Sequence, residues 1–248
     1  MINVKLKDGS IIEIEENSSV LDLAKLISKK LGKSAVVGEV NGTLVDLDYK
    51  LKDNDEVNIV TYEDKAGIEV MRHTTSHVMA QAVKRLYKDV KLAIGPTVEN
   101  GFYYDFDIEI PFNNEDLVKI EEEKKKIIKE DISLERVIVS REEALKLMEE
   151  RGEVYKVELI KALPEGETIS LYKQGDFIDL CRGPHLLSTK GIKDFKLTSV
   201  AGAYWRGNEK NKMLQRIYGV AFANKEILKT YLNNIEEAKK RDHRKLGK

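Results

Sequence analysis

The sequence predicts an α+β protein with an N-terminal domain over residues 1–62, a larger domain over 63–224 and a terminal helix over 225–248. Three observations predict this arrangement. The 248 residues exceed one small module, and their 42% hydrophobic content can form buried cores. Short alternating apolar segments separated by turns fill the first part. Amphipathic helices interleaved with strand-like segments fill the second.

The first 62 residues alternate rapidly between short apolar segments and turns. Ile2–Leu6 is apolar at every second position, Asp8-Gly9 predicts a hairpin turn, and Ile11–Ile14 returns. Ser18 and Ser19 offer an N-cap for a helix, and Gly32 is expected to end that helix as a left-handed C-cap. Short strands are then expected on both sides of an Asn-Gly turn and beyond it: 36–40, 43–45 and 57–60. This order of elements predicts a ubiquitin-like β-grasp domain.

After a polar linker at 63–67, a helix is predicted over 68–87, with Met71, Val78 and Ala82 on its core side. Asn113 and Asn114 can cap a charged helix that runs to about Glu130. Ser140 and Glu143 predict a capping box for a helix from 141 to 152. An amphipathic helix is predicted at 227–238, followed by a basic segment at 239–245. The remaining predicted elements are strands at 102–106, 134–139, 169–173, 177–181, 195–200 and 213–222. They favour an antiparallel α+β domain.

Composition restricts the environment and the partners. No apolar run is long enough to span a membrane, the first residues lack the form of a signal peptide, and one cysteine cannot make an internal disulfide. We therefore expect a soluble cytoplasmic chain with no membrane partner. Residues 182–248 carry sixteen Lys/Arg and six Asp/Glu, whereas residues 1–60 carry eight and eleven. This asymmetry favours a polyanionic partner, with ordinary solvated lysines as the alternative.

Two short motifs contain three of the four histidines and the single cysteine. His73 and His77 are four residues apart, on the side of their helix opposite its apolar stripe. In the second motif, strand alternation places Asp179 and Cys181 on one face, and Gly-Pro at 183–184 can turn His185 back toward them. Surface histidines and a buried structural cysteine are the alternatives. Taken together, the four groups suit either a zinc site or the orientation of a water molecule.

Nucleotide-binding and nucleophile-elbow patterns do not occur in the sequence. Eight segments instead form a distinctive set: 73–77, 94–96, 100–105, 155–159, 179–185, 201–207, 214–219 and 241–247. At these segments the sequence resembles the N-terminal half of bacterial threonyl-tRNA synthetases. The resemblance implies that the first domain is a TGS domain and that the second is an editing domain shared with alanyl-tRNA synthetases. It also implies an aminoacylation core after residue 248, which would contain the ATP and zinc sites and make the homodimer. This chain alone is then expected to be monomeric and inactive in aminoacylation.

The resemblance implies post-transfer editing, in which water hydrolyses the ester of serine mischarged on threonine tRNA. Serine lacks only one methyl group of threonine, and a missing methylene gives about 1–3 kcal/mol of discrimination in a pocket. A synthetic site that accepts threonine therefore cannot exclude serine by size. A second, smaller pocket can accept serine and reject the added methyl group.

The resemblance also implies the site residues. His73, His77, Lys156, Cys181 and His185 are expected to surround the ester, with His73 and Lys156 holding the attacking water and stabilising the leaving ribose oxygen. It further implies two substrate-binding residues: Asp179 for the serine ammonium group and Tyr104 for the terminal adenosine. From the residues alone, a lysine in the position of Lys156 is more often solvated.

The matching His/His/Cys/His set binds zinc in the alanyl relatives, whereas the threonyl family is thought to edit without an ion there. We therefore expect no metal at His73, His77, Cys181 and His185, which are the candidate ligands if zinc is present. The expected partner is the 3′ acceptor end of threonine tRNA carrying serine. The TGS-like domain is acidic, and its role stays open. Two other functions stay open: a non-catalytic RNA-binding or regulatory module, and a free-standing alanyl-type tRNA deacylase.

Overall fold

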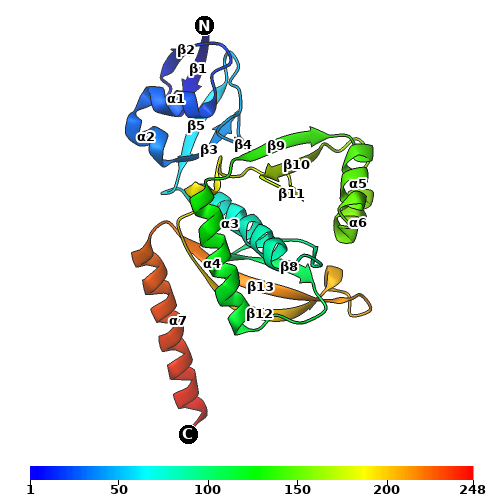
Figure 1. Cartoon of the computed structure of the whole chain (residues 1–248). Helices are drawn as coiled ribbons and strands as arrows, with labels where there is room; N and C mark the ends of the chain where they lie inside the picture. The colour runs from blue at the N-terminus through cyan, green and yellow to red at the C-terminus, as the bar shows by residue number, and fades with distance from the viewer. Residues whose placement is uncertain (248) are drawn as a thin grey trace.

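The computed structural model describes residues 1–247, which form three β-sheets connected by helices (Figure 1). One sheet belongs to the N-terminal domain. The other two lie on opposite sides of α3 (Lys65–Leu86), the long helix at the centre of the second domain (Figure 1). The predicted α+β class, with antiparallel sheets and a β-grasp-like N-terminal domain, is confirmed.

The N-terminal sheet has the strand order β2-β1-β5-β3-β4, with β1 parallel to β5 and the other neighbours antiparallel. Gly9 has φ +87° in the first hairpin, and Asn41 and Gly42 both have positive φ in the second, as the turn signals predicted. α1 packs its apolar side on this sheet through Val20 and Leu23. The bounds are β1 Ile2–Leu6, β2 Ile11–Ile14, α1 Val20–Ile27, α2 Lys29–Ser34, β3 Ala35–Val40, β4 Thr43–Val45 and β5 Glu56–Thr61.

The prediction of one continuous helix in this domain is wrong, because the segment forms two helices. Ser19 caps α1 in a reciprocal capping box, but α1 ends at Ile27, because Ser28 is extended and caps a second helix, α2. Gly32 lies inside α2 and does not have positive φ. A Cβ on Gly32 would be 2.7 Å from Cγ of Lys25, so this glycine lets the two helices approach closely. The apolar spacing continued through the break and concealed it.

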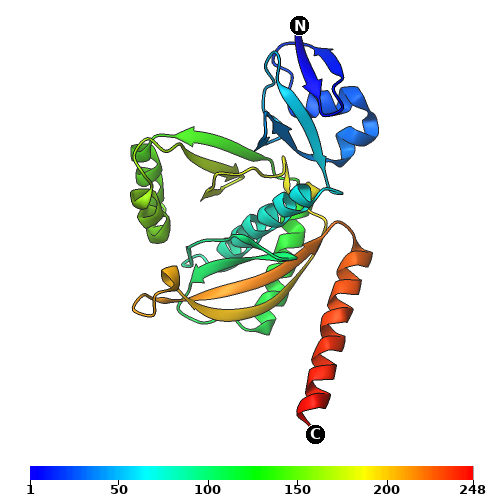
Figure 2. The same ribbon diagram turned by 180° about the vertical axis from the view of Figure 1, so that it is seen from behind.

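The second domain contains a large sheet of order β12-β13-β8-β6, with β7 also paired to β8, and a small sheet of order β11-β10-β9. Figure 2 shows the large sheet in front of α3 and α4. The bounds are β6 Lys91–Leu92, β7 Thr97–Val98, β8 Gly101–Asp107, α4 Asn114–Glu130, β9 Leu134–Val139, α5 Arg141–Glu150, β10 Ile169–Gln174, β11 Phe177–Leu180, β12 Asp194–Tyr204 and β13 Met213–Phe222. The capping signals at Asn113 and Ser140 begin α4 and α5 as predicted.

α3 is buried around most of its circumference, not only on the predicted apolar side. Met71, Val78 and Ala82 are fully buried in the core that includes the large sheet. The opposite stripe is covered by the small sheet. On that stripe, Gln81 donates from Nε2 to the carbonyl of Gln174 at 3.0 Å. The histidine side of α3 therefore faces the interior of the domain, between the two sheets.

The segment predicted as a polar linker is short, because α3 already begins at Lys65. The Asp64 carboxylate accepts a hydrogen bond from the backbone N–H of Thr61 at 2.8 Å. A Cβ on Gly67 would collide with the carbonyl oxygen of Thr61. β5 and α3 are thus joined closely, and Val36, Val37 and Val60 of the N-terminal domain belong to the same apolar cluster as α3.

One helix that the sequence analysis did not predict is α6 (Val154–Ala162), which packs beside α5. The apolar residues of α6 do not gather on one side of the helix, and Glu153 makes no side-chain cap. Strong local signals were therefore missing. The helix matters because it holds Lys156 in a buried position.

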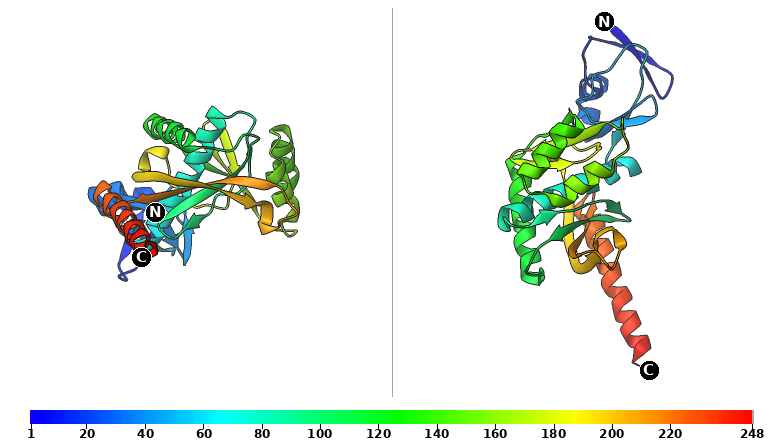
Figure 3. Two further views of the ribbon diagram at one scale, coloured as in Figure 1. Left: turned by 90° about the horizontal axis from the view of Figure 1, so that it is seen from below. Right: turned by 90° about the vertical axis from the view of Figure 1, so that its right-hand side faces the viewer.

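α7 (Lys225–Leu246) begins after β13, with Asn224 as its N-cap, and extends away from the rest of the chain (Figure 3). It is longer than predicted, because the basic segment at 239–245 continues the helix. Within residues 1–247, no helix combines the length and apolar character needed to cross a membrane.

Candidate active site

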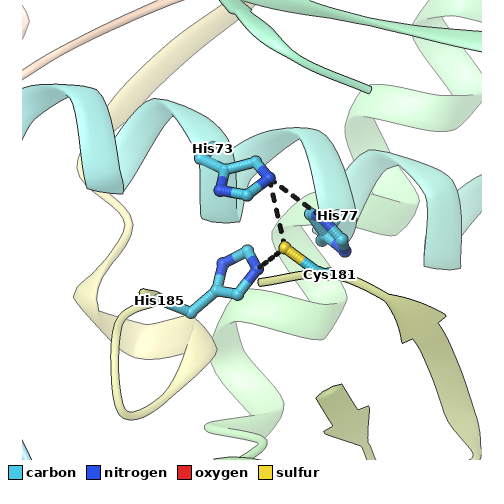
Figure 4. Close-up of side chains that lie close together, drawn as sticks. All are labelled: His73, His77, Cys181 and His185. Atoms are coloured by element: carbon cyan, nitrogen blue, oxygen red, sulfur yellow. Dashed lines mark hydrogen bonds between the residues drawn. The ribbon is translucent and has the colours of Figure 1, made fainter. Parts of the chain in front are cut away.

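Four side chains predicted from the two motifs lie together in the second domain (Figure 4). His73 and His77 project from α3, and Cys181 and His185 follow β11. Nε2 of His73 is 3.2 Å from Nε2 of His77 and 3.5 Å from Sγ of Cys181. Sγ of Cys181 is also 3.2 Å from Nε2 of His185. The spatial convergence that the motifs predicted is therefore present.

Local sequence accounts for this convergence. The spacing of four residues places both histidines on one side of α3. In β11, alternation turns Asp179 toward α3. Gly183 then adopts φ +74°, a conformation that favours glycine, and a Cβ there would collide with the Tyr172 hydroxyl. The chain can consequently reverse and bring His185 back against Cys181.

Asp179 connects this cluster to Lys156 and Tyr104. Its Oδ1 pairs with Nζ of Lys156 at 2.8 Å and accepts from the N–H of Leu180 at 2.8 Å. Its Oδ2 accepts from the Tyr104 hydroxyl at 2.7 Å and pairs with Nδ1 of His77 at 3.1 Å. Both carboxylate oxygens thus have two partners each. Asp179 can contact a serine ammonium group only if one partner moves, so its substrate-binding role stays a prediction.

The structure does not place Tyr104 where a terminal adenosine could contact it. Tyr104 is fully buried, stacks on Phe106 and donates to Asp179. Burial, followed by the nearby Asp179 charge, raises its pKa, so the hydroxyl keeps its proton. The tyrosine supports Asp179 from behind. The expected contact with adenosine does not fit this placement, because α3 packs on the face of β8 from which Tyr104 projects and buries it.

The pKa values of two imidazoles and the thiol in this cluster are shifted in different directions. Burial opposes protonation of His77, but Asp179 and Cys181 outweigh burial and raise its pKa to about 9. Burial and the charge of His77 lower the pKa of His185 to about 3. Burial opposes ionisation of Cys181, but the neighbouring imidazoles outweigh it and lower the thiol pKa well below its usual range.

Thr74 fixes the ring orientation of His185 and was not singled out by the sequence analysis, although it lies inside the 73–77 motif. Its hydroxyl donates to the carbonyl of Val70 at 3.1 Å and lies 2.9 Å from Nδ1 of His185. This contact fixes the plane of the imidazole ring. In that orientation Nε2 of His185 faces Sγ of Cys181, 3.2 Å away.

A pocket of about 310 Å³ opens beside this cluster. Polar groups on one side of it include His73, Lys156 and Cys181, and apolar walls come from Ile94, Pro96 and Leu159. Lys156 lines the pocket although its side chain is only 4% exposed. A small molecule in this pocket would thus lie beside an imidazole, a lysine and a cysteine. Such a set can orient water and stabilise a leaving oxygen.

Comparison with known proteins assigns both parts of the chain. Residues 2–61 match the TGS domain family, and residues 169–218 match the family described as the threonyl and alanyl tRNA synthetase second additional domain. Threonine–tRNA ligases from Acetivibrio thermocellus, Caldanaerobacter subterraneus subsp. tengcongensis and Clostridium tetani are 64%, 60% and 58% identical over 248, 245 and 248 residues. These matches cover 99–100% of this chain and 38–39% of the length of those relatives.

The chain corresponds to the N-terminal region of threonyl-tRNA synthetases. The TGS match covers β1 to β5. The second match, to the editing-type domain that threonyl- and alanyl-tRNA synthetases share, begins at β10 and contains Cys181 and His185. His73, His77 and Lys156 precede the matched segment and reach the site from α3 and α6.

The spacing of the four donor groups fits a zinc ion. With Zn–N about 2.0 Å and Zn–S about 2.3 Å, the donors of a tetrahedral site lie about 3.3–3.5 Å apart. The ligating atoms of His73, His77, Cys181 and His185 all lie within 4.8 Å of one another, and three of their separations are 3.2–3.5 Å. Asp179 and Thr74 could orient the histidines from outside. A zinc ion held by all four groups would have no open position for water, as in structural zinc sites.

Proposed function

We propose that this chain hydrolyses the ester bond between serine and the 3′ end of threonine tRNA, the editing reaction of threonyl-tRNA synthetase. The observation that carries the proposal is the placement of Lys156 and His73 on one pocket, both connected to the buried Asp179. A buried carboxylate that fixes an ammonium group and, through His77, an imidazole is expensive in folding free energy. That expense favours a catalytic use over a relic fold that only docks on RNA.

In the proposed reaction, water attacks the ester carbonyl carbon. A bond forms from the water oxygen to that carbon, the bond to the ribose oxygen breaks, and the ribose oxygen gains a proton. His73 holds the water and takes its proton. Lys156 stabilises the negative charge on the departing ribose oxygen and can supply the proton.

The remaining polar groups position these two. Asp179 accepts from His77, and His77 faces Nε2 of His73 at 3.2 Å. This chain of contacts fixes the His73 ring, as the third group does in other catalytic arrays. Cys181 and His185 complete the polar cluster beside His73 and His77. A thiolate at Cys181 is a possible nucleophile, but water attack gives hydrolysis in one step without a seryl-enzyme intermediate.

Discrimination between serine and threonine is assigned to the size of the pocket. The apolar walls at Ile94, Pro96 and Leu159 limit the space around the bound side chain. We expect the additional methyl group of threonine to collide there, with a rate difference equivalent to about 1–3 kcal/mol. The proposed reaction uses no metal. Zinc held by all four protein groups would bind the His73 nitrogen that the reaction needs for the water.

The experiment is a comparison of three substrates under single-turnover conditions with the chain in excess: Ser-tRNA(Thr), Thr-tRNA(Thr) and Ser-tRNA(Ala). Selective loss of serine from the first supports editing. No hydrolysis of any substrate contradicts the proposal and favours the non-catalytic RNA-binding module. Equal hydrolysis of Ser-tRNA(Ala) favours the free-standing alanyl-type deacylase. We expect a monomer, measured by light scattering, and activity in the cytoplasm, where tRNA is charged.

A further inference from the structure

We propose that Asp46 of the TGS domain is a positioning residue for the editing centre, because it holds the loop that carries His185. This inference rests on the proposed function and assigns a role to the N-terminal domain. Asp46 and His185 are 139 positions apart in the sequence, and no single motif contains both. Only the packing of the two domains brings them together.

The Asp46 carboxylate makes two contacts across the domain boundary. Its Oδ1 accepts from the backbone N–H of His185 at 2.8 Å, and its Oδ2 accepts from the Tyr172 hydroxyl at 2.8 Å. The Tyr172 ring packs edge-on against the His185 ring, with centroids 4.4 Å apart. A single carboxylate therefore holds both the main chain of His185 and the aromatic ring beside its imidazole.

The same loop has little freedom to adopt another path. The Tyr172 hydroxyl also lies where a Cβ on Gly183 would be, so the phenol, Gly183 and Asp46 pack against one another. His185 is 1% exposed and Tyr172 is 2% exposed. On the far side, Thr74 fixes Nδ1 of His185. α3 therefore contacts the imidazole of His185 directly, and the TGS domain holds the backbone N–H of the same residue.

Asp46 itself is held by its own domain. Its carbonyl oxygen accepts from the N–H of Tyr49 at 3.0 Å, and the next residue, Leu47, accepts at its carbonyl from the N–H of Leu21 in α1 at 2.9 Å. A second contact between the domains is 2.6 Å long, from the Tyr62 hydroxyl to the carbonyl of Gly191. Since the domains are fixed at more than one point, the Asp46 carboxylate can act as a stable acceptor for the catalytic loop.

The test compares the whole chain with Asp46→Ala, Asp46→Asn and a matched control, Asp48→Ala, which removes an exposed carboxylate from the same loop. For Asp46→Ala we expect a fall of roughly tenfold in the single-turnover deacylation rate, with the concentration for half-maximal rate unchanged within about twofold. Asp46→Asn keeps an oxygen acceptor for the His185 N–H and should recover most of the rate. Asp48→Ala should match the wild type.

A second measurement separates failure of this inference from failure of the proposed function. The sequence has four histidines, so long-range ¹H–¹⁵N spectra of a chelator-treated sample can follow each ring. In Asp46→Ala we expect the His185 signals to shift or broaden, while those of the exposed His243 stay in place. Unchanged His185 signals, or equal rates for all variants of a chain that melts normally, would overturn the inference. If the wild type is inactive, the spectra alone decide the inference. Should Asp46→Ala unfold, Asp46→Leu takes its place, because leucine has a similar size and no acceptor oxygen for the His185 N–H.

Discussion

Lys156 and Asp179 form a buried ion pair, with Nζ of Lys156 2.8 Å from Oδ1 of Asp179 and side chains that are 4% and 1% exposed. Burial alone would raise the pKa of Asp179, but Lys156 and His77 outweigh burial and hold it below its usual range. Removing one partner would leave the other charge buried without compensation. The pair therefore links the stability of the domain to the position of the proposed catalytic ammonium group.

The first prediction concerns Lys156→Ala. We expect deacylation of Ser-tRNA(Thr) to fall by about 10²–10³-fold, since the charge that stabilises the leaving oxygen is lost. The free energy of unfolding should also fall, by about 3–5 kcal/mol, because Asp179 loses its cation. Single-turnover kinetics and urea titration measure the two effects. Lys161→Ala, on the exposed end of the same helix, should change neither.

His73→Ala should separate catalysis from stability. His73 is only partly buried, and its Nε2 contacts His77 and Cys181. We expect the deacylation rate to fall by about 10²–10⁴-fold, as for loss of a general base, with a smaller loss of stability than in Lys156→Ala. His243→Ala is the control. Wild-type rates in both His73→Ala and Lys156→Ala would contradict the proposed mechanism.

Zinc gives a third prediction, because the four-donor cluster can hold it by geometry. We expect protein purified without added metal to contain far less than one zinc ion per chain and to keep its deacylation rate in chelator. Added zinc should slow the reaction, since an ion held by His73, His77, Cys181 and His185 would remove His73 as the base and leave no open position for water. Stoichiometric zinc in an active preparation, with activity lost on chelation, would reverse the assignment.

Much of this site could be predicted from local sequence. The spacing of His73 and His77 sets their common side of α3, and strand alternation correctly turned Asp179 away from the neighbouring aliphatic residues. Capping signals at Asn113 and Ser140 located α4 and α5 for the same reason: each depends on residues within one helical turn.

The rest depends on contacts between distant segments. The burial of Tyr104 follows from packing of β8 against α3, and its bond to Asp179 spans 75 residues. The bond from His185 to Asp46 spans 139 residues and crosses two domains. Lys156 resembled a solvated lysine because α6 has no one-sided apolar pattern. No periodicity in a short window contains such information, so tertiary packing decides these three positions.

The last prediction concerns Lys124, which lies in α4 and is fully buried. Within residues 1–247 its Nζ has no hydrogen-bond partner, although it lies 4.5 Å and 4.2 Å from the ring centres of Phe102 and Phe195. Burial lowers the pKa of Lys124 well below its usual range, because it outweighs the two aromatic rings, which favour the ammonium form. Lys124→Met should therefore raise the free energy of unfolding at pH 7 by on the order of 1–3 kcal/mol.

The stability difference between Lys124→Met and the wild type should depend on pH, and the direction of the pKa shift fixes its sign. Because the folded pKa of Lys124 is lower than the unfolded one, the unfolded chain binds an additional proton at pH values between the two, and its cost to stability grows as pH falls below about 10.5. The advantage of Lys124→Met over the wild type should consequently be larger at pH 7 than at pH 10, as measured by urea titration. Lys125→Met, which changes the exposed neighbour, should show no such trend. A less stable Lys124→Met at pH 7 would instead mean that the two phenylalanine rings hold a stabilising ammonium group.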